Sequence, residues 1–328
     1  MTSINTGASG TTAVETTRRK RKIPDYAPLL AVLILMIIMF SFLSEYFLQV
    51  DNFRNVLSNA AVTGVVCIPS TFLIISGQID LSVGSAAAVS GMILAQVVNK
   101  HGVGTGLIAV LLFGLALGIF NGLIVTVLGV NALITTLGGL GFLYGVALLI
   151  GNGQTVQMKN FEWLGTAQPF TIPLPVIIFF GLAIIGSITL RYTKFGRSIY
   201  AIGSNPNAAR VVGIRSNRII FMTFILSSTA AALAGAILAS QLSAGDPNSG
   251  LGLELQVVTA IVLGGASLAG GRGSILGTVL GLLVVGILNN GLILMDVPTF
   301  WQRIAQGMTL IVAVSFDSVR QKFNNTRA

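Results

Sequence analysis

The chain has 328 residues, of which 53% are hydrophobic and only 9% are charged. A soluble globular protein carries about 25% charged residues, so this composition excludes an ordinary water-facing domain. It also excludes a disordered chain, which needs low hydrophobicity. The only cysteine, Cys67, lies in an apolar run where we expect it to be buried, and the only histidine is His101. A single cysteine cannot form an internal disulfide, and one histidine excludes most metal sites and most histidine acid–base chemistry. We therefore expect neither a metal site nor a catalytic residue.

The net charge of +9 is distributed as in a membrane protein rather than in a nucleic-acid-binding protein. Five basic residues at positions 18–22 directly precede the first apolar segment. Basic residues that flank apolar segments report membrane orientation. We expect residues 1–25 to form a disordered basic tail. The segment Tyr26–Ser44 holds 19 uncharged residues with no clear cleavage site after it, so we expect a retained first transmembrane helix.

Uncharged windows long enough to span a bilayer continue to residue 316. One of them, Gly102–Met158, has room for two spans with a break at 129–131. The sequence therefore predicts an all-α, polytopic membrane protein with about ten transmembrane helices in a permease domain over residues 26–318, followed by a tail at 319–328. The windows are Tyr26–Ser44, Asn55–Ile79, Leu81–Asn99, Gly102–Met158, Trp163–Leu190, Ile219–Gly245, Leu255–Gly271, Gly273–Met295 and Ile304–Phe316.

The distribution of lysine and arginine predicts that both termini are cytoplasmic. With ten alternating spans and the N-terminus inside, 15 of the 19 basic residues lie inside and 4 lie outside. The four outside residues are Arg54, Lys100, Lys159 and Arg303. The positive-inside rule favours this arrangement strongly, because removing one span would move either the N-terminal run or the 191–218 loop to the wrong side.

Glycine spacing indicates close helix packing and an inverted internal repeat. Gly114 and Gly118 are four residues apart, as are Gly277 and Gly281. Small residues at this spacing let membrane helices approach closely. The segment 118–124 also resembles 286–293, and the two run in opposite directions in this topology. Inverted repeats build many transporters, although chance similarity among glycine-rich segments is the alternative.

The loop 191–218 is expected to be cytoplasmic and holds six basic residues and no acid. Within it, Asn205 suits a helix N-cap and Pro206 suits the first helical position. Gly213 can end a helix in the left-handed conformation. The sequence predicts a helix of about two turns, capped at both ends and outside the bilayer, which offers a small docking surface. A simple surface turn is the alternative.

Three motifs resemble bacterial ABC sugar-importer permeases of the ribose family. The stretch from Lys194 to Ile214 is similar to the coupling loop of that family. Residues 76–85 (SGQIDLSVGS) resemble the signature after its second span, and residues 262–273 (VLGGASLAGGRG), followed by 289–292 (NNGL), resemble its C-terminal signature. The motifs occur in the same order and spacing, and the similarity covers about residues 27–316.

The resemblance implies the membrane subunit of an ATP-driven importer in the bacterial cytoplasmic membrane, moving a monosaccharide such as ribose or another pentose. The implied partners are a cytoplasmic ATPase, an extracytoplasmic sugar-binding protein and a second permease copy. No nucleic acid is implied. ATP and Mg²⁺ would bind the ATPase, because this chain has no Gly-x-x-x-x-Gly-Lys-Ser/Thr loop and is expected to bind no cofactor. The implied ATPase-coupling residues are Asn205, Pro206, Asn207, Ala208, Ala209, Arg210, Val211 and Gly213.

Uncharged polar side chains within apolar spans are the candidates for the sugar pathway, because they donate and accept hydrogen bonds. Asp80 is the one acid expected near the membrane interior, where it either caps the following helix or lines the pathway. The candidate residues are Asp80, Ser82, Ser85, Asn121, Asn131, Thr135 and Asn290, with Thr136, Gln256, Thr259 and Asn289 of the same chemical kind. Bonds between helices are the alternative role for such residues.

Two other functions compete with the importer. An ion-coupled secondary transporter of a small polar solute would need paired ionisable groups inside the bundle, and only Asp80 is available. An intramembrane enzyme would need catalytic partners that one histidine and one cysteine do not supply.

Overall fold

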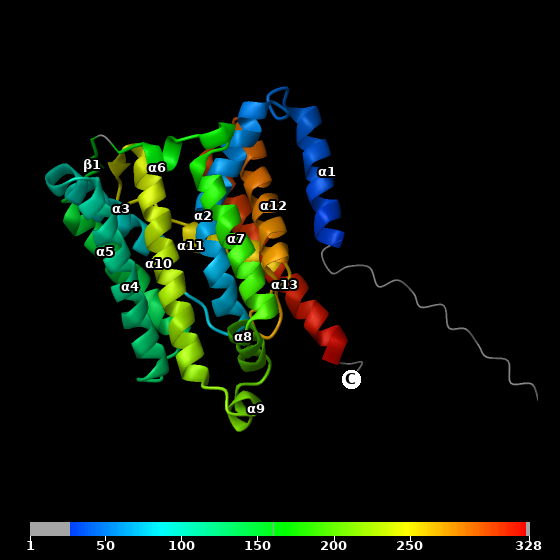
Figure 1. The fold of residues 1–328 in the computed structure, drawn as a ribbon. Coiled ribbons are helices and arrows are strands. Elements are labelled where there is room, and N and C mark those ends of the chain that lie inside the picture. Colours follow the sequence, from blue (N-terminus) through cyan, green and yellow to red (C-terminus); the bar gives the residue numbers. More distant parts are fainter. Residues whose placement is uncertain (1–26, 160, 326–328) are drawn as a thin grey trace, which may run out of the picture.

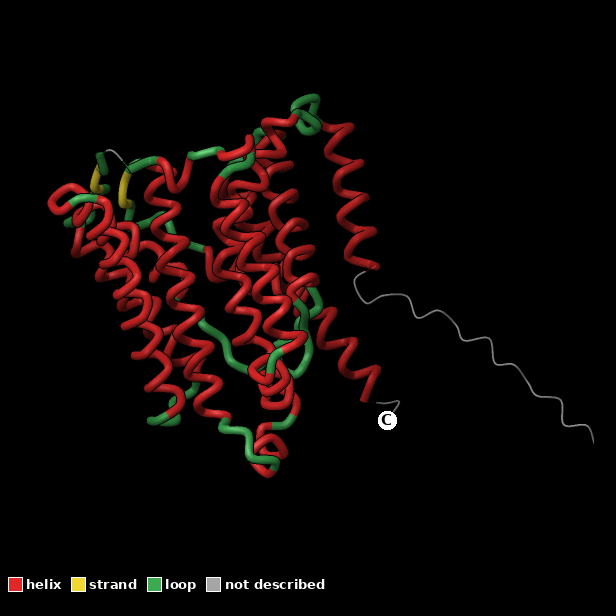
Figure 2. Tube along the Cα trace, viewed as in Figure 1, coloured by secondary structure: helices red, strands yellow, loops and turns green. Residues whose placement is uncertain are grey.

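The protein is a bundle of long helices with a small two-stranded ribbon at one end (Figures 1 and 2). The structure, a computed structural model, describes residues 27–159 and 161–325. The N-terminal tail expected at 1–25 lies outside the described residues. The ribbon pairs β1 (Val156–Gln157) antiparallel with β2 (Ala244–Gly245), with Val156 opposite Gly245. We call this end of the bundle the ribbon end and the opposite end, which carries a short helix over 206–211, the α9 end.

In the described part of the chain, each of the ten expected spans overlaps one helix, with the differences in boundaries given below. The bounds of these helices are α1 (Ala27–Leu43), α2 (Val50–Ile75), α3 (Val83–His101), α4 (Val103–Thr126), α5 (Ala132–Ile150), α7 (Leu174–Tyr192), α10 (Ser216–Leu242), α11 (Leu253–Leu263), α12 (Ile275–Leu294) and α13 (Thr299–Asn325). The connecting elements are α6 (Trp163–Thr166), the 3-10 turn η1 (Pro169–Thr171), α8 (Lys194–Ser204) and α9 (Pro206–Val211).

The all-α, polytopic class predicted from the sequence is confirmed. Among the described residues, six helices are long and apolar enough to cross a membrane, namely α2, α4, α5, α7, α10 and α12. The helices α1 and α11 are shorter, with 17 and 11 residues. The total of ten spans and the cytoplasmic position of both termini therefore remain predictions.

The boundaries agree with the sequence in one place and differ in two. The break expected at 129–131 separates α4 from α5. The window Trp163–Leu190 is not one helix, because the prolines at 169 and 173 interrupt it and α7 begins only at Leu174. The window Leu255–Gly271 is helical only to Leu263. A glycine loop over 264–273 follows, with positive φ at Gly265, Gly270 and Gly271.

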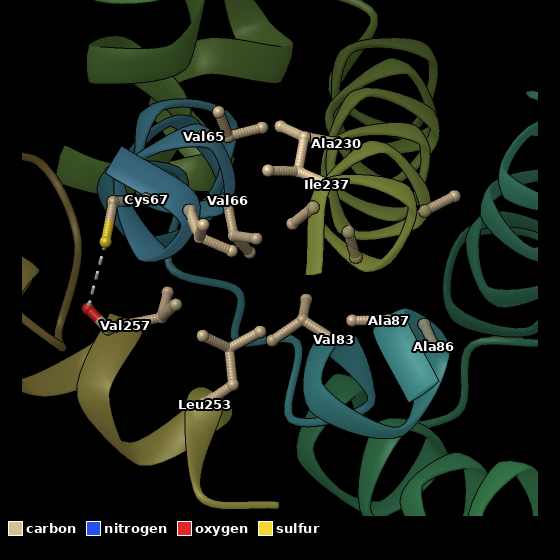
Figure 3. Close-up of a cluster of buried hydrophobic side chains, with 14 of the residues drawn as sticks. Val65, Val66, Cys67, Val83, Ala86, Ala87, Ala230, Ile237, Leu253 and Val257 are labelled. Atoms are coloured by element: carbon tan, nitrogen blue, oxygen red, sulfur yellow. Dashed lines mark hydrogen bonds between the residues drawn. The ribbon is translucent and has the colours of Figure 1, made fainter. Parts of the chain in front are cut away.

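Helix α2 forms the centre of the bundle. In its most apolar stretch 89% of residues are buried, against 17% in α5. It contacts α7, α10, α11 and α12. Figure 3 shows side chains of α2, α3, α10 and α11 converging on this core, with the buried Cys67 thiol 4.0 Å from the Val257 carbonyl oxygen. The burial expected for Cys67 is confirmed. The outward side chains of α4, α5 and α7 are large and apolar, as contact with lipid requires.

The two glycine pairs pack helices together as expected. A Cβ atom added at Gly118 would overlap the backbone of α10 at Ile225, and one added at Gly114 would crowd Thr229 of the same helix. Additions at Gly277 and Gly281 would overlap the backbone at the end of α11. These glycines therefore allow the close helix contacts that their spacing predicts.

Two series of four helices have matching order and opposite direction. The long helix α2 ends at the α9 end and is followed by α3, α4 and α5; the long helix α10 begins at the α9 end and is followed by α11, α12 and α13. The two similar segments, 118–124 and 286–293, lie on α4 and α12, which hold the same place in the two series.

Candidate functional site

The short helix predicted at 205–213 is present and capped at both ends. The Asn205 side-chain oxygen accepts hydrogen bonds from the backbone N–H groups of Asn207 and Ala208, at 3.1 and 3.0 Å. Pro206 occupies the first helical position. Gly213 has a φ of +83° and its N–H donates to the Arg210 carbonyl oxygen at 3.0 Å. Both caps match the sequence prediction, so α9 is a compact element outside the bundle (Figure 1).

The exposed surface of α9 differs from the one expected. Both alanines of the helix were expected to face a partner, but Ala209 is buried, with 2% of its surface exposed. It packs inward because the short helix needs one apolar contact with the rest of the chain. The outward apolar side chains are those of Val211 and Val212, which are 89% and 74% exposed. Large exposed valines beside Arg210 mark this surface as available to a partner.

Helix α8 lies between α9 and the bundle and joins the two (Figure 1). The Thr193 side chain caps α8 by accepting from the Gly196 N–H at 3.1 Å. Gly196, Ile199 and Ile202 form the buried face. The Phe195 ring packs edge-on against Phe72 of α2, with 6.3 Å between ring centroids. Helix α8 is therefore in contact with both α9 and the end of α2.

The three motifs quoted from the sequence meet in space at the α9 end. A Cβ atom added at Gly270 would lie 3.0 Å from the Gly203 Cα and 3.1 Å from the Gly77 Cα. One added at Gly203 would overlap the carbonyl oxygen of Ile75. The Gly271 N–H donates to that same carbonyl oxygen at 2.8 Å. Segments about 65 residues apart or more along the chain thus touch through backbone alone, which explains why glycine recurs in each motif.

Tyr200 adds a side-chain link at the same place. Its hydroxyl donates to the Gly273 carbonyl oxygen at 2.8 Å, which joins α8 to the glycine loop before α12. Burial raises the pKa of the Tyr200 hydroxyl, so the group stays protonated and remains a donor. This contact connects the α9 surface with the ends of α11 and α12.

Asp80 lies in a buried network rather than at a helix cap. The N-cap of α3 is Ser82, and the Asp80 carboxylate accepts from the Ser82 N–H at 3.0 Å and the Ser82 hydroxyl at 2.6 Å. Its second oxygen accepts from Ser227 of α10 at 3.3 Å, and Asn121 of α4 donates to the Ser82 hydroxyl at 3.2 Å. The helix-capping role considered for Asp80 is therefore replaced by an Asx turn that ties the start of α3 to α4 and α10.

The other predicted pathway residues lie at the start of α3, at the start of α5 and towards the ribbon end. Ser85 is buried in the first turn of α3. Asn131 caps α5 by accepting from the Leu133 N–H at 2.8 Å, and the Thr135 hydroxyl donates to the Asn131 carbonyl oxygen at 3.0 Å. Asn290 lies towards the ribbon end, where it forms a reciprocal amide pair with Asn52 at 2.8 and 3.1 Å. The structure thus brings Asp80, Ser82 and Asn121 together, with Ser85 one turn further along α3, and places Asn290 in another part of the bundle.

Two cavities of appreciable size accompany these residues. One, of about 420 Å³, lies at the α9 end beside Asn131 and is bounded by the 77–79 segment, the α4–α5 turn and the start of α10. The other, of about 270 Å³, lies between α2, α11, α12 and α13 in the half of the bundle towards the ribbon end. We call the second one the amide chamber, because six of its lining residues are Asn59, Gln256, Asn289, Asn290, Gln302 and Gln306.

The sequence interpretation found only part of the amide chamber. It singled out Gln256, Asn289 and Asn290 and missed Asn59, Thr63, Gln302 and Gln306. The missed residues carry a helical signal: Asn59 and Thr63 are four apart, as are Gln302 and Gln306, with Thr309 three further on. This spacing places polar groups on one face of an otherwise apolar helix.

The fold and these surfaces define a multi-pass membrane protein with a rigid helical element at one end and a polar chamber inside. A family model for the branched-chain amino acid transport system / permease component matches residues 52–314. The chain belongs to this family. It is therefore a permease component, that is, a transport subunit rather than an enzyme.

Known relatives are sugar permeases. The chain is 37% identical over 300 residues to the ribose import permease protein RbsC of Escherichia coli strain K12, covering 89% of this chain and 93% of the relative. It is 35% identical over 329 residues to the L-arabinose transport system permease protein AraH of the same strain, covering 99% and 100%. It is 32% identical over 362 residues to the xylose transport system permease protein XylH of Haemophilus influenzae, covering 90% and 96%. No solved structure was found to match. The expected relationship to the ribose family is confirmed.

Proposed function

We propose that this chain is the membrane-spanning permease subunit of an ATP-driven importer that moves a monosaccharide, ribose or another pentose, across the bacterial cytoplasmic membrane. The relatives carry the names of ribose, arabinose and xylose permeases, and all three sugars are pentoses. The observation that carries the proposal is the meeting of the three motifs between α9 and the bundle, because it connects an exposed helix with the ends of α2, α11 and α12.

The proposed topology has ten spans with both termini in the cytoplasm. Its support is the division of basic residues, 15 inside and 4 outside. The α9 end would face the cytoplasm and the ribbon end would face outwards. Cysteine variants at the exposed positions Gln157 and Asn207 test this, because the native Cys67 is fully buried. A membrane-impermeant thiol reagent added to intact cells should label position 157 and leave position 207 unlabelled, and the reverse pattern would contradict the topology.

In this proposal, α9 is the surface on which the ATPase docks. The contact residues are Asn205, Pro206, Asn207, Ala208, Arg210 and Val211, with Gly213 holding the end of the helix and Ala209 supporting it from within. ATP and Mg²⁺ bind the ATPase subunit, and this chain binds no cofactor. Closure of the ATPase dimer pushes α9, and α8 carries the movement to the glycine loop and α2.

Further partners complete the assembly. An extracytoplasmic sugar-binding protein delivers the solute to the ribbon end, and a second copy of the permease binds the second ATPase. Within each copy, the two antiparallel helix series form an inverted repeat around the pathway, which supports alternating access. Asp80, Ser82 and Asn121 hold the start of α3 in place, and Ser85, Asn131 and Thr135 lie along the route towards the α9 end.

Purification of the tagged permease with its ATPase tests the assignment. The sugar-loaded binding protein should stimulate ATP hydrolysis by the complex several-fold over the sugar-free binding protein. A permease that never retains an ATPase, or a complex that hydrolyses ATP at one rate with and without sugar, would contradict the proposal.

A further inference from the structure

We infer that the amide chamber is the place in the permease where an uncharged, polyhydroxylated solute is bound during its passage, and that the chamber excludes charged sugars. This inference rests on the proposed function, because it takes the solute to be a monosaccharide. The chamber is assigned from its own side chains, which come from four helices that meet only in the folded protein.

The lining has a consistent chemistry. Seven of the lining side chains are uncharged and polar, namely the six amides and Thr63, and none of the lining residues, all within the described part of the chain, is charged. The remaining lining residues are apolar, among them Val56, Leu282 and Ile293. Amides are costly to bury in membrane-spanning helices unless they find hydrogen-bond partners. Gln256, Asn290 and Gln302 bond to Thr63, Asn52 and the Val297 carbonyl oxygen, so a polar molecule would bind the amide groups that stay unbonded.

The hydrogen bonds leave the chamber ready for hydroxyl groups. Gln306 donates to the Asn289 side-chain oxygen at 3.1 Å, which leaves the Gln306 oxygen and the Asn289 amino group without a bond among the described residues. The Asn59 side chain likewise forms no hydrogen bond within the part that the structure describes. A carboxamide offers both a donor and an acceptor, and so does a hydroxyl. A sugar that carries several hydroxyls can therefore satisfy both kinds of free group.

Because its lining carries no charge, the amide chamber excludes charged solutes. An ionised phosphate or carboxylate that leaves water without a cationic partner loses far more hydration free energy than neutral amides can restore. The neighbouring basic residue Arg303 is exposed and is not part of the lining. The chamber therefore accepts neutral sugars and rejects sugar phosphates and sugar acids.

The position and volume of the chamber fit one small solute that moves from the ribbon end towards the α9 end. The chamber volume of about 270 Å³ is just under the roughly 300–1,000 Å³ of drug-sized ligand pockets. From Val56 to Thr63 the lining rises about 10 Å along α2, so the chamber reaches into the bundle. A second cavity, of about 10 Å³, lies beside the same Gln256 and Gln306 and is also lined by Thr259 and Thr309. Polar side chains therefore continue from the chamber along α11 and α13.

Four variants, reconstituted in liposomes with the ATPase and the binding protein, test the inference. Gln306→Leu and Asn289→Leu remove one amide each while suiting a membrane helix, and the double variant removes the bonded pair. Each single variant should lower the initial rate of radiolabelled ribose uptake, per folded permease, about two- to tenfold, the value of one neutral hydrogen bond. The double variant should lower it by more than tenfold. Gln306→Glu has nearly the same size but adds charge, and should transport as slowly as the leucine variant.

The matched control is Asn55→Leu, which removes an exposed amide of α2 that does not line the chamber and should keep the wild-type rate. If the leucine variants fail to assemble, Thr63→Val supplies an isosteric apolar change on another helix and should slow uptake about two- to tenfold. A double variant or Thr63→Val that transports at the wild-type rate overturns the inference and leaves the proposed function standing. A wild-type complex that takes up no neutral sugar overturns both.

Discussion

The charge of Asp80 and its hydrogen bonds can be tested separately by two substitutions. Its carboxylate accepts from Ser82 twice and from Ser227 once, and it is only 6% exposed. We predict that Asp80→Asn leaves nearly the wild-type amount of folded protein, because the amide keeps one acceptor oxygen for Ser82 and can donate to the Ser227 hydroxyl. Transport should fall more than the amount of protein, because the negative charge at the start of α3 is lost.

Asp80→Leu is the contrasting variant. It leaves the Ser82 and Ser227 groups without their acceptor, and each unsatisfied buried group costs about 1–3 kcal/mol. Size-exclusion chromatography in detergent should show a large loss of folded Asp80→Leu. Equal amounts of folded protein and equal uptake for Asp80→Asn and wild type would show that the charge of Asp80 has no role in transport.

The exposed valine at the end of α9 is the residue that best tests docking. Val211→Asp places a charge on the exposed apolar surface without touching the bundle. We predict a loss of ATPase binding of at least tenfold, measured by co-purification, with normal insertion of the permease. Ala209, one of the coupling residues implied by the sequence, is unsuitable for this test, because a large side chain at its buried position would disturb α9 itself.

The control for that variant is Val50→Asp at the other end of the molecule. Val50 is 66% exposed and begins α2, where a carboxylate is favourable to the helix dipole. It should leave ATPase binding unchanged. Equal binding by both variants and the wild type would show that the ATPase docks elsewhere.

At the scale of elements, the link between α8 and the glycine loop should transmit movement. Tyr200→Phe removes only the hydroxyl that donates to Gly273, at a cost of about 1 kcal/mol in stability. We predict that the complex hydrolyses more ATP for each sugar transported, because α8 slips relative to the loop. Tyr192→Phe, in a tyrosine that is 66% exposed, is the control and should keep the wild-type ratio. An unchanged ratio in Tyr200→Phe would place the transmission elsewhere.

The packing of α4 on α10 depends on a glycine that has no room for a side chain. Gly118→Ala puts a methyl group against the Ile225 backbone, so we predict a clear fall in the thermal unfolding temperature of the detergent-solubilised protein. Gly138→Ala in α5 meets open space and should be neutral or slightly stabilising, since alanine favours helix more than glycine does. Equal unfolding temperatures for the two variants would contradict the packing account.

Local signals predicted individual elements well. The caps of α9, the break between α4 and α5 and the glycine contacts all follow from short-range chemistry that single residues carry. Apolar composition did not separate a whole span from the short helix α11 with its glycine loop, because the window 255–271 is uncharged throughout. Apolar composition also gave no sign of the interruption by proline before α7.

The candidate sites depend on contacts between distant segments, and this is why the sequence located them only partly. Asp80, Ser82 and Asn121 come together because α3 and α4 pack there, whereas Asn290 is brought to Asn52, 238 positions earlier in the chain. The inward orientation of Ala209 likewise depends on what α9 packs against. Polar spacing along α2 and α13 was available in the sequence, but its meaning appears only when the four helices enclose one cavity.

For the whole molecule, the central claim is that ATP hydrolysis by a partner drives a neutral sugar through this permease. The direct measurement is the uptake of labelled sugar into liposomes that hold no sugar at the start. The liposomes contain the permease, its ATPase and the external binding protein. We predict that labelled ribose or another pentose accumulates only when ATP and Mg²⁺ are inside, and that ionophores which collapse ion gradients have no effect. Accumulation without ATP that an imposed ion gradient drives and an ionophore abolishes would contradict the account and establish a secondary transporter.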